Sequence, residues 1–315
     1  MKFPISKKIR AHLHEIRHSL EIHLQNQFWN EKKYIGFPTP SFYIIRRRDP
    51  KVGLFSYFIT NLGGIRKAVE SGYTPVIDMM TYPNTYLSAE DVNQINSWEY
   101  FFEQPCKYTL QNTKFHCKIV NSGEVEYSLP SLNSNPQEFL IWKEYANQYI
   151  RFSSKALHEI DTAYQQLIPA GKRILGVLCR GSDYINLRPH GHPVQPTVEM
   201  MIEKVESALI DWQCEYIYLA TEDYDICEKF KEKFGQKVIF QTADKLHYDH
   251  SGYVSDYMPA ATSSKLQQGM TYLVSIGILT RCNAFIAGNT SGTLGVMLLP
   301  NQFEHTYIWD LGLYD

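Results

Sequence analysis

The chain has 315 residues, of which 44% are hydrophobic and 20% are charged, and its formal net charge is −2. This composition is typical of a globular protein with enough apolar side chains for sizeable cores, and the length suits two domains of ordinary size. The small net charge supplies no basic field of the kind that a general nucleic-acid-binding protein uses.

The cysteines and the amino-terminal segment bear on the cellular compartment. The six cysteines include no Cys-x-x-Cys pair, and several lie within apolar runs, which predicts reduced, buried thiols. The amino terminus lacks the apolar core of a signal peptide, and no stretch approaches the ~20 apolar residues of a membrane span. We therefore expect a cytoplasmic protein.

Residues 1–30 are predicted to contain an amphipathic helix. Ile9, Leu13, Ile16 and Leu20 form an apolar stripe at roughly helical spacing, with lysine, arginine and histidine around it. Such a helix can lie on an anionic membrane surface, which would place the protein at the inner face of the membrane. It can equally pack against its own domain, and the sequence leaves both alternatives open.

A strand–helix–strand unit follows the amino-terminal segment. The pattern predicts a strand at 42–47, a helix at 54–71 that ends at Gly72, and a second strand at 74–79. Asp78 falls at the end of that second strand. It is therefore a candidate for the acceptor side of a site.

The remainder of the first half is aromatic and then helical. Residues 81–105, with Trp98 and Glu103 among them, could cradle a polar ring-shaped acceptor or form a packed extension of the core. A single long helix is predicted over 137–167, and 169–171 is the expected domain boundary. The residues expected to be buried in this helix are Phe139, Leu140, Trp142, Tyr145, Tyr149, Phe152, Leu157 and Ile160.

In the second half, strand and helix patterns alternate, which predicts a parallel, doubly wound α/β sheet. Strands are expected at 174–179, 215–220, 237–241, 284–287 and 306–309. Helices are expected at 197–210, 223–234 and 265–282, with a short helix ending at Leu299.

Polar clusters follow three of these strands. They are Arg180 with Asp183, residues 221–223 and residues 289–292. The carboxyl ends of parallel strands share one edge, so the clusters can converge there. The arginine fork suits a phosphate, and the third cluster leads into a helix whose N–H groups favour an anion. An Arg–Asp pair that pins a loop is the alternative. The Walker and G-x-G-x-x-G sequences do not occur.

Three segments carry a resemblance to a known family. Residues 176–184, 217–223 and 279–292 resemble, in order and spacing, the three motifs of the fucosyltransferase superfamily. That superfamily includes the α1,6-, α1,2- and protein O-fucosyltransferases. The resemblance covers about 173–299, and two first-half segments, 53–78 and 96–105, resemble bacterial members more loosely.

The resemblance implies a GT-B fold, in which two Rossmann-like domains with mostly parallel sheets face each other across a cleft. Residues 1–170 would form the acceptor side, and 171–315 would bind the nucleotide-sugar. It also implies an inverting, metal-independent glycosyltransferase without a cofactor, whose donor is most often GDP-fucose. The partners would be this nucleotide-sugar and a glycan acceptor, and not nucleic acid.

The resemblance also assigns roles to residues. Arg180 matches the arginine that neutralises the β-phosphate of the donor, and Asp183 is the nearest carboxylate that could take a proton. The candidate donor-binding residues are Arg180, His192, Thr221, Glu222, Asp223, Asn289, Thr290, Ser291 and Gly292. The acceptor-side candidates are Asp78, Trp98 and Glu103. Gly181 replaces the second arginine of the motif, and Ser275 stands where an aspartate is expected to read guanine.

Two histidine groups contain potential metal ligands, His190 with His192, and His247 with Asp249 and His250, but neither has a convincing partner cluster. The sequence thus predicts an enzyme that moves fucose, or a related deoxysugar, from a nucleoside diphosphate to a glycan in polysaccharide or glycoprotein biosynthesis. The alternatives are a non-catalytic nucleotide-sugar-binding protein of the same fold and a phosphoryl-handling enzyme.

Overall fold

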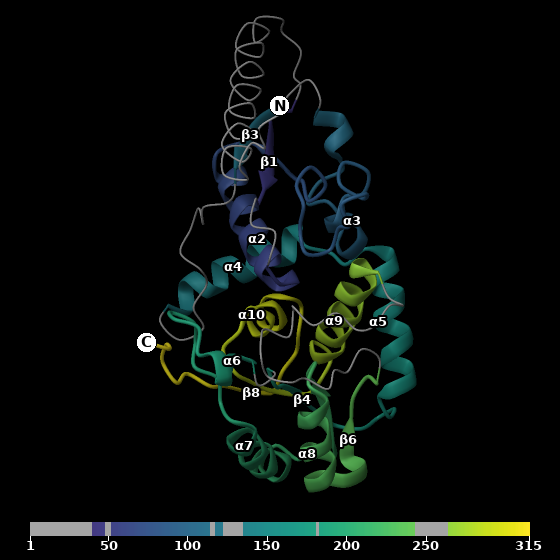
Figure 1. The fold of residues 1–315 in the computed structure, drawn as a ribbon, viewed down its shortest axis with the longest axis vertical. Helices are drawn as coiled ribbons and strands as arrows, with labels where there is room; N and C mark the ends of the chain where they lie inside the picture. Colours follow the sequence, from purple (N-terminus) through teal and green to yellow (C-terminus); the bar gives the residue numbers. More distant parts are fainter. Residues whose placement is uncertain (1–39, 48–51, 114–116, 122–134, 181–182, 243–263) are drawn as a thin grey trace, which may run out of the picture.

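The structure is a computed structural model that describes residues 40–47, 52–113, 117–121, 135–180, 183–242 and 264–315 (Figure 1). Of residues 117–121 and of Asp183 it describes the backbone alone. The amphipathic helix predicted within residues 1–30 lies outside these ranges, as does the group of His247, Asp249 and His250.

The first half is built on a three-stranded parallel sheet with strand order β2-β1-β3. Its strands are β1 (Phe42–Arg46), β2 (Thr74–Ile77) and β3 (Cys117–Asn121). Phe42 is aligned with Thr74 on one side and with Cys117 on the other. The predicted strand–helix–strand unit is confirmed. The sequence did not predict β3.

Helix α2 (Leu54–Glu70) connects β1 to β2 and ends next to Gly72, as predicted. Gly72 has a φ of 74°, a conformation that glycine adopts without strain. Within the helix, Gly64 permits close packing, because a Cβ atom there would lie 2.8 Å from the Ile45 side chain. The short helix α3 (Ser97–Phe101) and the 3-10 helix η1 (Leu110–Thr113) follow.

The prediction of one long helix over 137–167 was wrong, because two helices occur there, α4 (Pro136–Tyr149) and α5 (Ser154–Leu167). The Ser153 hydroxyl accepts a hydrogen bond from the Ala156 N–H at 3.1 Å and so starts a new helix. The same hydroxyl donates to the Tyr100 carbonyl at 2.9 Å. Leu140 and Leu157, expected to be buried, are 51% and 44% exposed.

The second half contains a five-stranded parallel sheet with strand order β6-β5-β4-β7-β8, as predicted for a doubly wound fold. The strands are β4 (Ile174–Leu178), β5 (Tyr216–Ala220), β6 (Val238–Ile239), β7 (Ala284–Ala287) and β8 (His305–Ile308). From β4 the chain adds two strands on one side and then two on the other. The direction of winding therefore reverses between β4 and β7.

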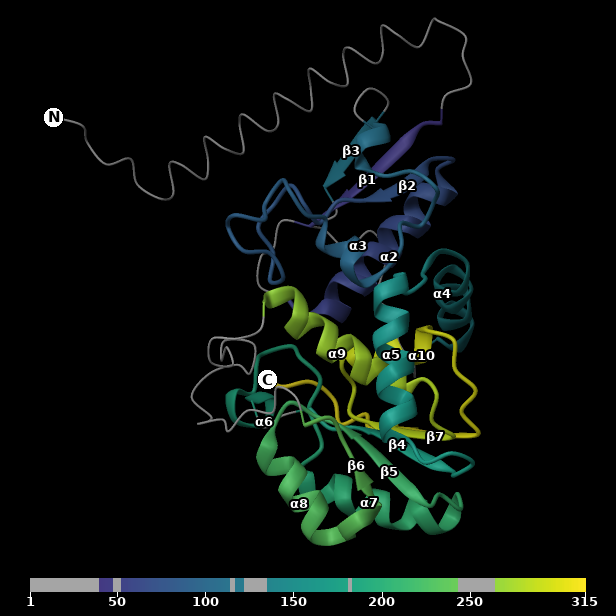
Figure 2. The same cartoon turned by 90° about the vertical axis from the view of Figure 1, so that its right-hand side faces the viewer.

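Helices cover both faces of this sheet (Figure 2). Helices α7 (Val198–Asp211) and α8 (Tyr224–Phe234) lie on one face, and α9 (Lys265–Leu279) and α10 (Ser291–Leu298) lie on the other. The predicted start of α7 at the Thr197 cap and the end of α8 at Gly235 are confirmed. Residues expected to be loop form the five-residue helix α6 (Asp183–Leu187), and the 3-10 helix η2 (Gly235–Lys237) precedes β6.

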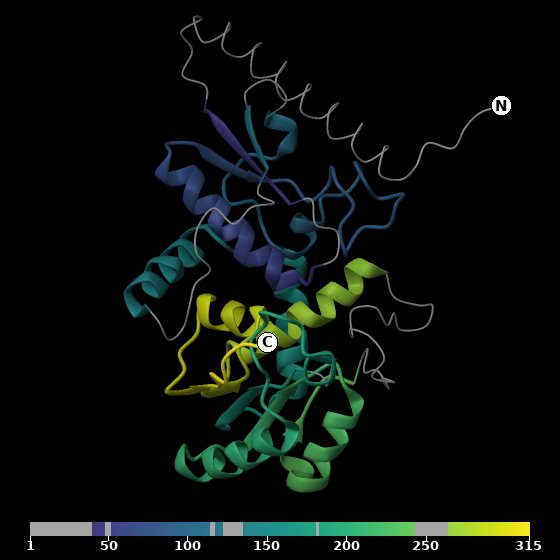
Figure 3. The same ribbon diagram turned by 60° about the vertical axis from the view of Figure 1, so that its left-hand side comes forward.

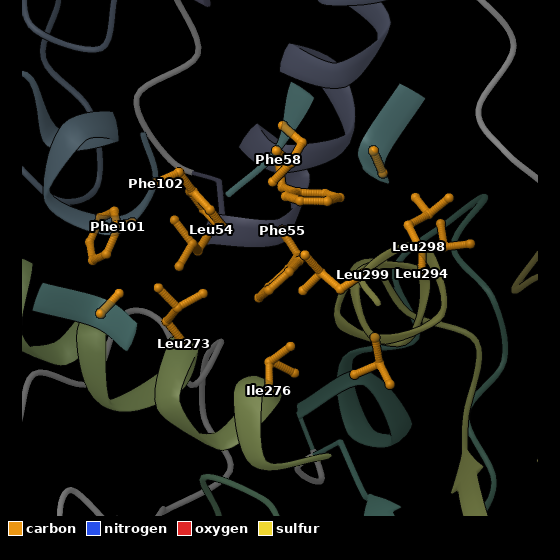
Figure 4. Close-up of a cluster of buried hydrophobic side chains, with 14 of the residues drawn as sticks. Leu54, Phe55, Phe58, Phe101, Phe102, Leu273, Ile276, Leu294, Leu298 and Leu299 are labelled. Atoms are coloured by element: carbon orange, nitrogen blue, oxygen red, sulfur yellow. The ribbon is translucent and has the colours of Figure 1, made fainter. Parts of the chain in front are cut away.

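Helices α9 and α10 lie between the two sheets (Figure 3), and one hydrophobic cluster extends from the first half into the second. The Phe55 ring of α2 points between α9 and α10 (Figure 4). A Cβ atom at Gly295 of α10 would lie only 2.0 Å from this ring. Glycine at this position therefore lets α10 approach α2 closely. None of the helices within the described ranges has both the length and the apolar composition that a membrane crossing requires.

Candidate functional site

The three polar clusters predicted from the sequence follow three adjacent strands. In the sheet, Leu178 at the end of β4 is aligned with Ala220 of β5 and Ala287 of β7. Arg180, residues 221–223 and residues 289–292 therefore leave the sheet at the same edge. The reversal of winding between β4 and β7 lies at the centre of this edge, which is where open α/β sheets bind ligands.

Arg180 is half-buried, and its guanidinium carbon lies 4.6 Å from the centre of the Tyr184 ring. The Tyr184 ring meets the exposed His192 edge-on, with 5.4 Å between ring centres and 3.4 Å between the tyrosine oxygen and Nδ1. Arg180 and His192 thus lie on either side of one aromatic ring. Asp183 begins α6, and its side chain is not among those that the structure describes.

Residues 312–314 hold the segment that carries His192. The Gly191 N–H donates to the Tyr314 carbonyl, the Tyr314 N–H donates to the His192 carbonyl, and the Val194 N–H donates to the Gly312 carbonyl, each at 2.9 Å. The Gln195 N–H reaches the Tyr314 hydroxyl at 3.3 Å. The position of His192 therefore depends on contacts that are distant in sequence.

The second cluster combines a helix cap with one outward carboxylate. Asp223 is 2% exposed and accepts the Asp225 N–H at 3.0 Å, so that it begins α8. The Thr221 hydroxyl accepts the Asp223 N–H at 3.2 Å. Glu222, between them, is half-buried, and its charge contributes to raising the pKa of Tyr86 and of Tyr272, although burial is the larger cause for both.

The third cluster forms the start of α10. The Thr290 hydroxyl caps the helix by accepting the Thr293 N–H at 3.1 Å, and the Gln195 amide donates to the Asn289 carbonyl at 2.9 Å. Ser291 is exposed, and Gly292 is buried. The first N–H groups of this eight-residue helix favour a negative charge at this point.

Tyr272 of α9 connects these clusters, and the sequence analysis did not identify it. A Cβ atom at Gly292 would lie 2.3 Å from the Tyr272 hydroxyl oxygen. Burial is the main cause that raises the pKa of this phenol, Glu222 raises it further, and Arg180 lowers it. The hydroxyl therefore contacts the third cluster, and the charges of Arg180 and Glu222 from the other two clusters act on it. Tyr272 lies in a largely apolar helix, and only the folded arrangement distinguishes it from a core residue.

The predicted acceptor-side residues are distributed differently. The buried Asp78 carboxylate accepts hydrogen bonds from Arg46 Nε at 2.5 Å, from the Thr81 hydroxyl at 2.6 Å, and from the Met80 and Thr81 N–H groups at 3.0 Å. Trp98 is fully buried, and its indole N–H donates to the Glu103 carbonyl at 2.9 Å. The structure thus gives Asp78 and Trp98 bonds that stabilise the first half.

Glu103 is exposed and lines a pocket of about 340 Å³ on the first half. The lining residues are Glu99, Phe102, Glu103, Gln104, Cys106, Lys107, Tyr108, Thr109, Ser153 and Ser154. All of them precede the second sheet in sequence. Glu103 is thus the one acceptor-side candidate whose side chain faces a hollow.

Ser275, which stands at the position where an aspartate was expected to read guanine, is bonded within the protein. Its hydroxyl accepts a hydrogen bond from the Gln241 amide at 2.9 Å, and the same amide lies 3.1 Å from the Tyr218 hydroxyl. Within the described ranges, no three histidine, cysteine, aspartate or glutamate side chains gather so as to hold a metal ion.

No protein-family model and no curated protein sequence matches the chain. Several solved structures are similar to it in fold. NodZ alpha-1,6-fucosyltransferase soaked with GDP-fucose has a TM-score of 0.51 and 15% identity, over 86% of this chain and 96% of that one. POFUT1 in complex with GDP has a TM-score of 0.54 and 10% identity, over 87% and 99%. A second structure of NodZ, from Bradyrhizobium, has a TM-score of 0.52 and 15% identity, over 87% and 96%.

These similarities extend over most of each chain and include both sheets. The architecture is therefore the α/β GT-B fold of the solved fucosyltransferases, as the sequence predicted.

Proposed function

We propose that this chain is a glycosyltransferase that moves fucose, or a related deoxysugar, from a nucleoside diphosphate, with GDP as the expected nucleotide, to a glycan acceptor. The observation that carries the proposal is the convergence of Arg180 with the start of α10 at the switch point between β4 and β7. The GDP or GDP-fucose bound to NodZ and POFUT1, which have this fold, supports the choice of donor.

In this proposal the second half binds the donor. Negative charge grows on the β-phosphate as its bond to the sugar breaks, and the Arg180 guanidinium can hold two phosphate oxygens as this happens. The N–H groups at the start of α10 favour the same charge. The positive charge of Arg180 and the partial positive charge of these N–H groups could together stabilise the departing nucleoside diphosphate without a metal ion.

The first half would hold the acceptor, with the exposed Glu103 pocket on its surface. Transfer with inversion is a single displacement, in which the acceptor hydroxyl attacks from the face opposite to the phosphate and loses its proton to a base. Asp183 is the carboxylate that follows β4 most closely in sequence, and Glu222 is the one that follows β5 most closely. We place the enzyme in the cytoplasm, where nucleotide-sugars are consumed in making polysaccharides or glycoproteins.

The donor is tested first by the thermal stability of the protein. GDP, UDP, ADP and inorganic phosphate are added separately at one concentration, and a ligand that binds the folded state more tightly raises the unfolding temperature more. We expect GDP to raise it most. If no nucleoside diphosphate raises it more than phosphate does, the transferase proposal is wrong.

Catalysis is tested by hydrolysis of GDP-fucose by wild type, Arg180→Ala, Arg180→Lys and Arg281→Ala. Arg281 pairs with Asp161 beyond the end of α9 and serves as the control. We expect Arg180→Ala to lower the rate on the order of 10²-fold or more, with partial recovery in Arg180→Lys. Binding of GDP with no hydrolysis by wild type would indicate a non-catalytic binding protein.

A further inference from the structure

The Tyr272 side chain packs against Phe55 and places its hydroxyl at the start of α10. It is half-buried on α9, and its ring meets the Phe55 ring edge-on with 5.8 Å between ring centres. Its hydroxyl lies against the backbone of Gly292, where a side-chain carbon would be 2.3 Å away. The hydroxyl is therefore at the start of α10, and the absence of a side chain at Gly292 makes room for it.

Two charged residues that follow other strands, Arg180 and Glu222, affect the Tyr272 phenol. Arg180, which follows β4, lowers the pKa of Tyr272, and Glu222, which follows β5, raises it. Burial raises it more than either charge, so the phenol keeps its proton at neutral pH. A protonated phenol can donate a hydrogen bond, and this one lies against Gly292 at the start of α10, where the helix N–H groups favour an anion.

Within the described ranges, the Tyr272 hydroxyl makes no hydrogen bond. Two other tyrosines near α9, Tyr100 and Tyr218, are bonded inside the protein. The Tyr100 hydroxyl donates to Gln267 at 3.3 Å, and the Tyr218 hydroxyl lies 3.1 Å from the Gln241 amide, which also reaches Ser275. The Tyr272 donor thus remains available for a ligand, in the half of the molecule that holds Arg180.

We infer that the Tyr272 hydroxyl donates a hydrogen bond to a β-phosphate oxygen of the nucleoside diphosphate, beside Arg180. The inference rests on the proposed function and adds a donor-binding residue to it. A hydrogen bond to a charged oxygen is stronger than one between neutral groups, and it strengthens further as charge grows on the leaving phosphate. Phe55 of the first half packs against this ring, so the acceptor-side half supports a contact made in the donor-side half.

The test uses Tyr272→Phe, which removes the hydroxyl and keeps the ring against Phe55. Calorimetry measures the affinity for GDP and for GMP, which lacks the β-phosphate. We expect GDP binding to weaken on the order of tenfold or more, from the usual strength of a hydrogen bond to a charged group, while GMP binding is unchanged. The hydrolysis of GDP-fucose should fall by at least the same factor.

Two controls separate this effect from a general loss of structure. Tyr100→Phe removes a hydroxyl that contacts the same helix elsewhere, and it should leave GDP affinity at the wild-type level. Gly292→Ala places a carbon where the Tyr272 hydroxyl lies, and it should weaken GDP in the same way as Tyr272→Phe. The unfolding temperature without ligand reports whether each variant is folded.

Three results would overturn the inference. The first is wild-type affinity for GDP in Tyr272→Phe, and the second is an equal loss for GMP and GDP, which would place the contact away from the β-phosphate. The third is that wild type itself binds no nucleoside diphosphate, in which case the proposed function fails and the inference fails with it. The first two results leave the proposed function standing, so the two failures are distinguishable.

Discussion

The two sheets place polar residues at equivalent edges, but they use them differently. At the edge of the first sheet, Arg46 ends β1, and its guanidinium is paired with Asp78, whose carboxylate is 2% exposed and accepts four hydrogen bonds. At the edge of the second sheet, Arg180 and Glu222 are half-buried, and Ser291 is exposed. The first edge is closed by internal bonds, whereas the second presents side chains to solvent.

The comparison teaches that the end of a parallel strand and an arginine are insufficient to define a site. Both edges have these features. At the first edge the buried Asp78 carboxylate accepts the donors around it. At the second edge Arg180 lies over the Tyr184 ring, and the buried Asp223 carboxylate begins a helix. Replacing Asp78 tests this difference, and three further substitutions test contacts elsewhere in the two halves.

The largest effect is expected for Asp78→Ala. It leaves Arg46 without its buried partner, and removing one member of a buried ion pair costs about 3–5 kcal/mol. Chemical denaturation measures the free energy of unfolding, with the exposed Glu90→Ala as the control. A loss below about 1 kcal/mol together with a large fall in transfer to the acceptor would instead assign Asp78 to the site.

The contact between the halves is tested by Gly295→Ala. The new carbon would lie 2.0 Å from the Phe55 ring, and overpacking of this kind costs about 1–3 kcal/mol. Adding Phe55→Leu should recover part of the loss, because the smaller side chain leaves room. The free energies of the single and double variants should therefore be non-additive. Additive values would mean that the two residues do not press on one another.

Ser153→Ala tests the break between α4 and α5. The variant removes the cap at the start of α5 and the bond to the Tyr100 carbonyl, and the expected loss is about 1–2 kcal/mol. Ser207→Ala, which removes an exposed hydroxyl bonded within its own helix, is the matched control. An unchanged free energy of unfolding would show that the break forms without the serine.

The smallest effect concerns pH and the thiol that precedes Arg180. Burial raises the pKa of Cys179 from its usual value of about 9 to about 12. Above pH 9 the unfolded chain loses this proton and the folded chain keeps it, so stability falls as the pH rises toward 12; below pH 9 both states are protonated and nothing changes.

This pH dependence is measured as the free energy of unfolding of Cys179→Ala and wild type at pH 7 and pH 10. Relative to its own value at pH 7, wild type should lose up to about 1.4 kcal/mol more than the variant by pH 10. Val177→Ala, at an equally buried position without a titrating group, should show the wild-type slope. The prediction is wrong if the free energy of unfolding of wild type and of Cys179→Ala depends on pH in the same way.

Most of the second half could be predicted from sequence, because its signals are local. The Thr197 and Asp223 caps and the Gly235 stop mark helix ends through bonds to residues only a few positions away. Adjacent parallel strands place their ends at one edge, which is why three polar clusters separated in sequence could be expected together. Whether those residues bind a donor stays a prediction.

The features that were not predicted depend on distant contacts. The break at Ser153 is stabilised in part by the carbonyl of Tyr100, 53 positions earlier. Leu140 and Leu157 have the spacing of buried residues, yet both side chains are exposed. Tyr272 belongs to an apolar helix, and it becomes a candidate site residue only through its contact with the distant Gly292 and the effect of the Arg180 charge on its phenol. Local patterns in the sequence do not contain this information.

The close packing of the Phe55 ring against Gly295 limits how one half can move relative to the other. If the two halves moved straight apart, the Phe55 ring would leave its close contact with Gly295, and the apolar cluster around it would be exposed to water. The free-energy cost is about 25 cal/mol for each Å² of apolar surface exposed. A rotation with the ring as its pivot exposes far less. Any movement of one half relative to the other should therefore be a tilt about this point, with the widest displacement at the parts of the molecule farthest from it.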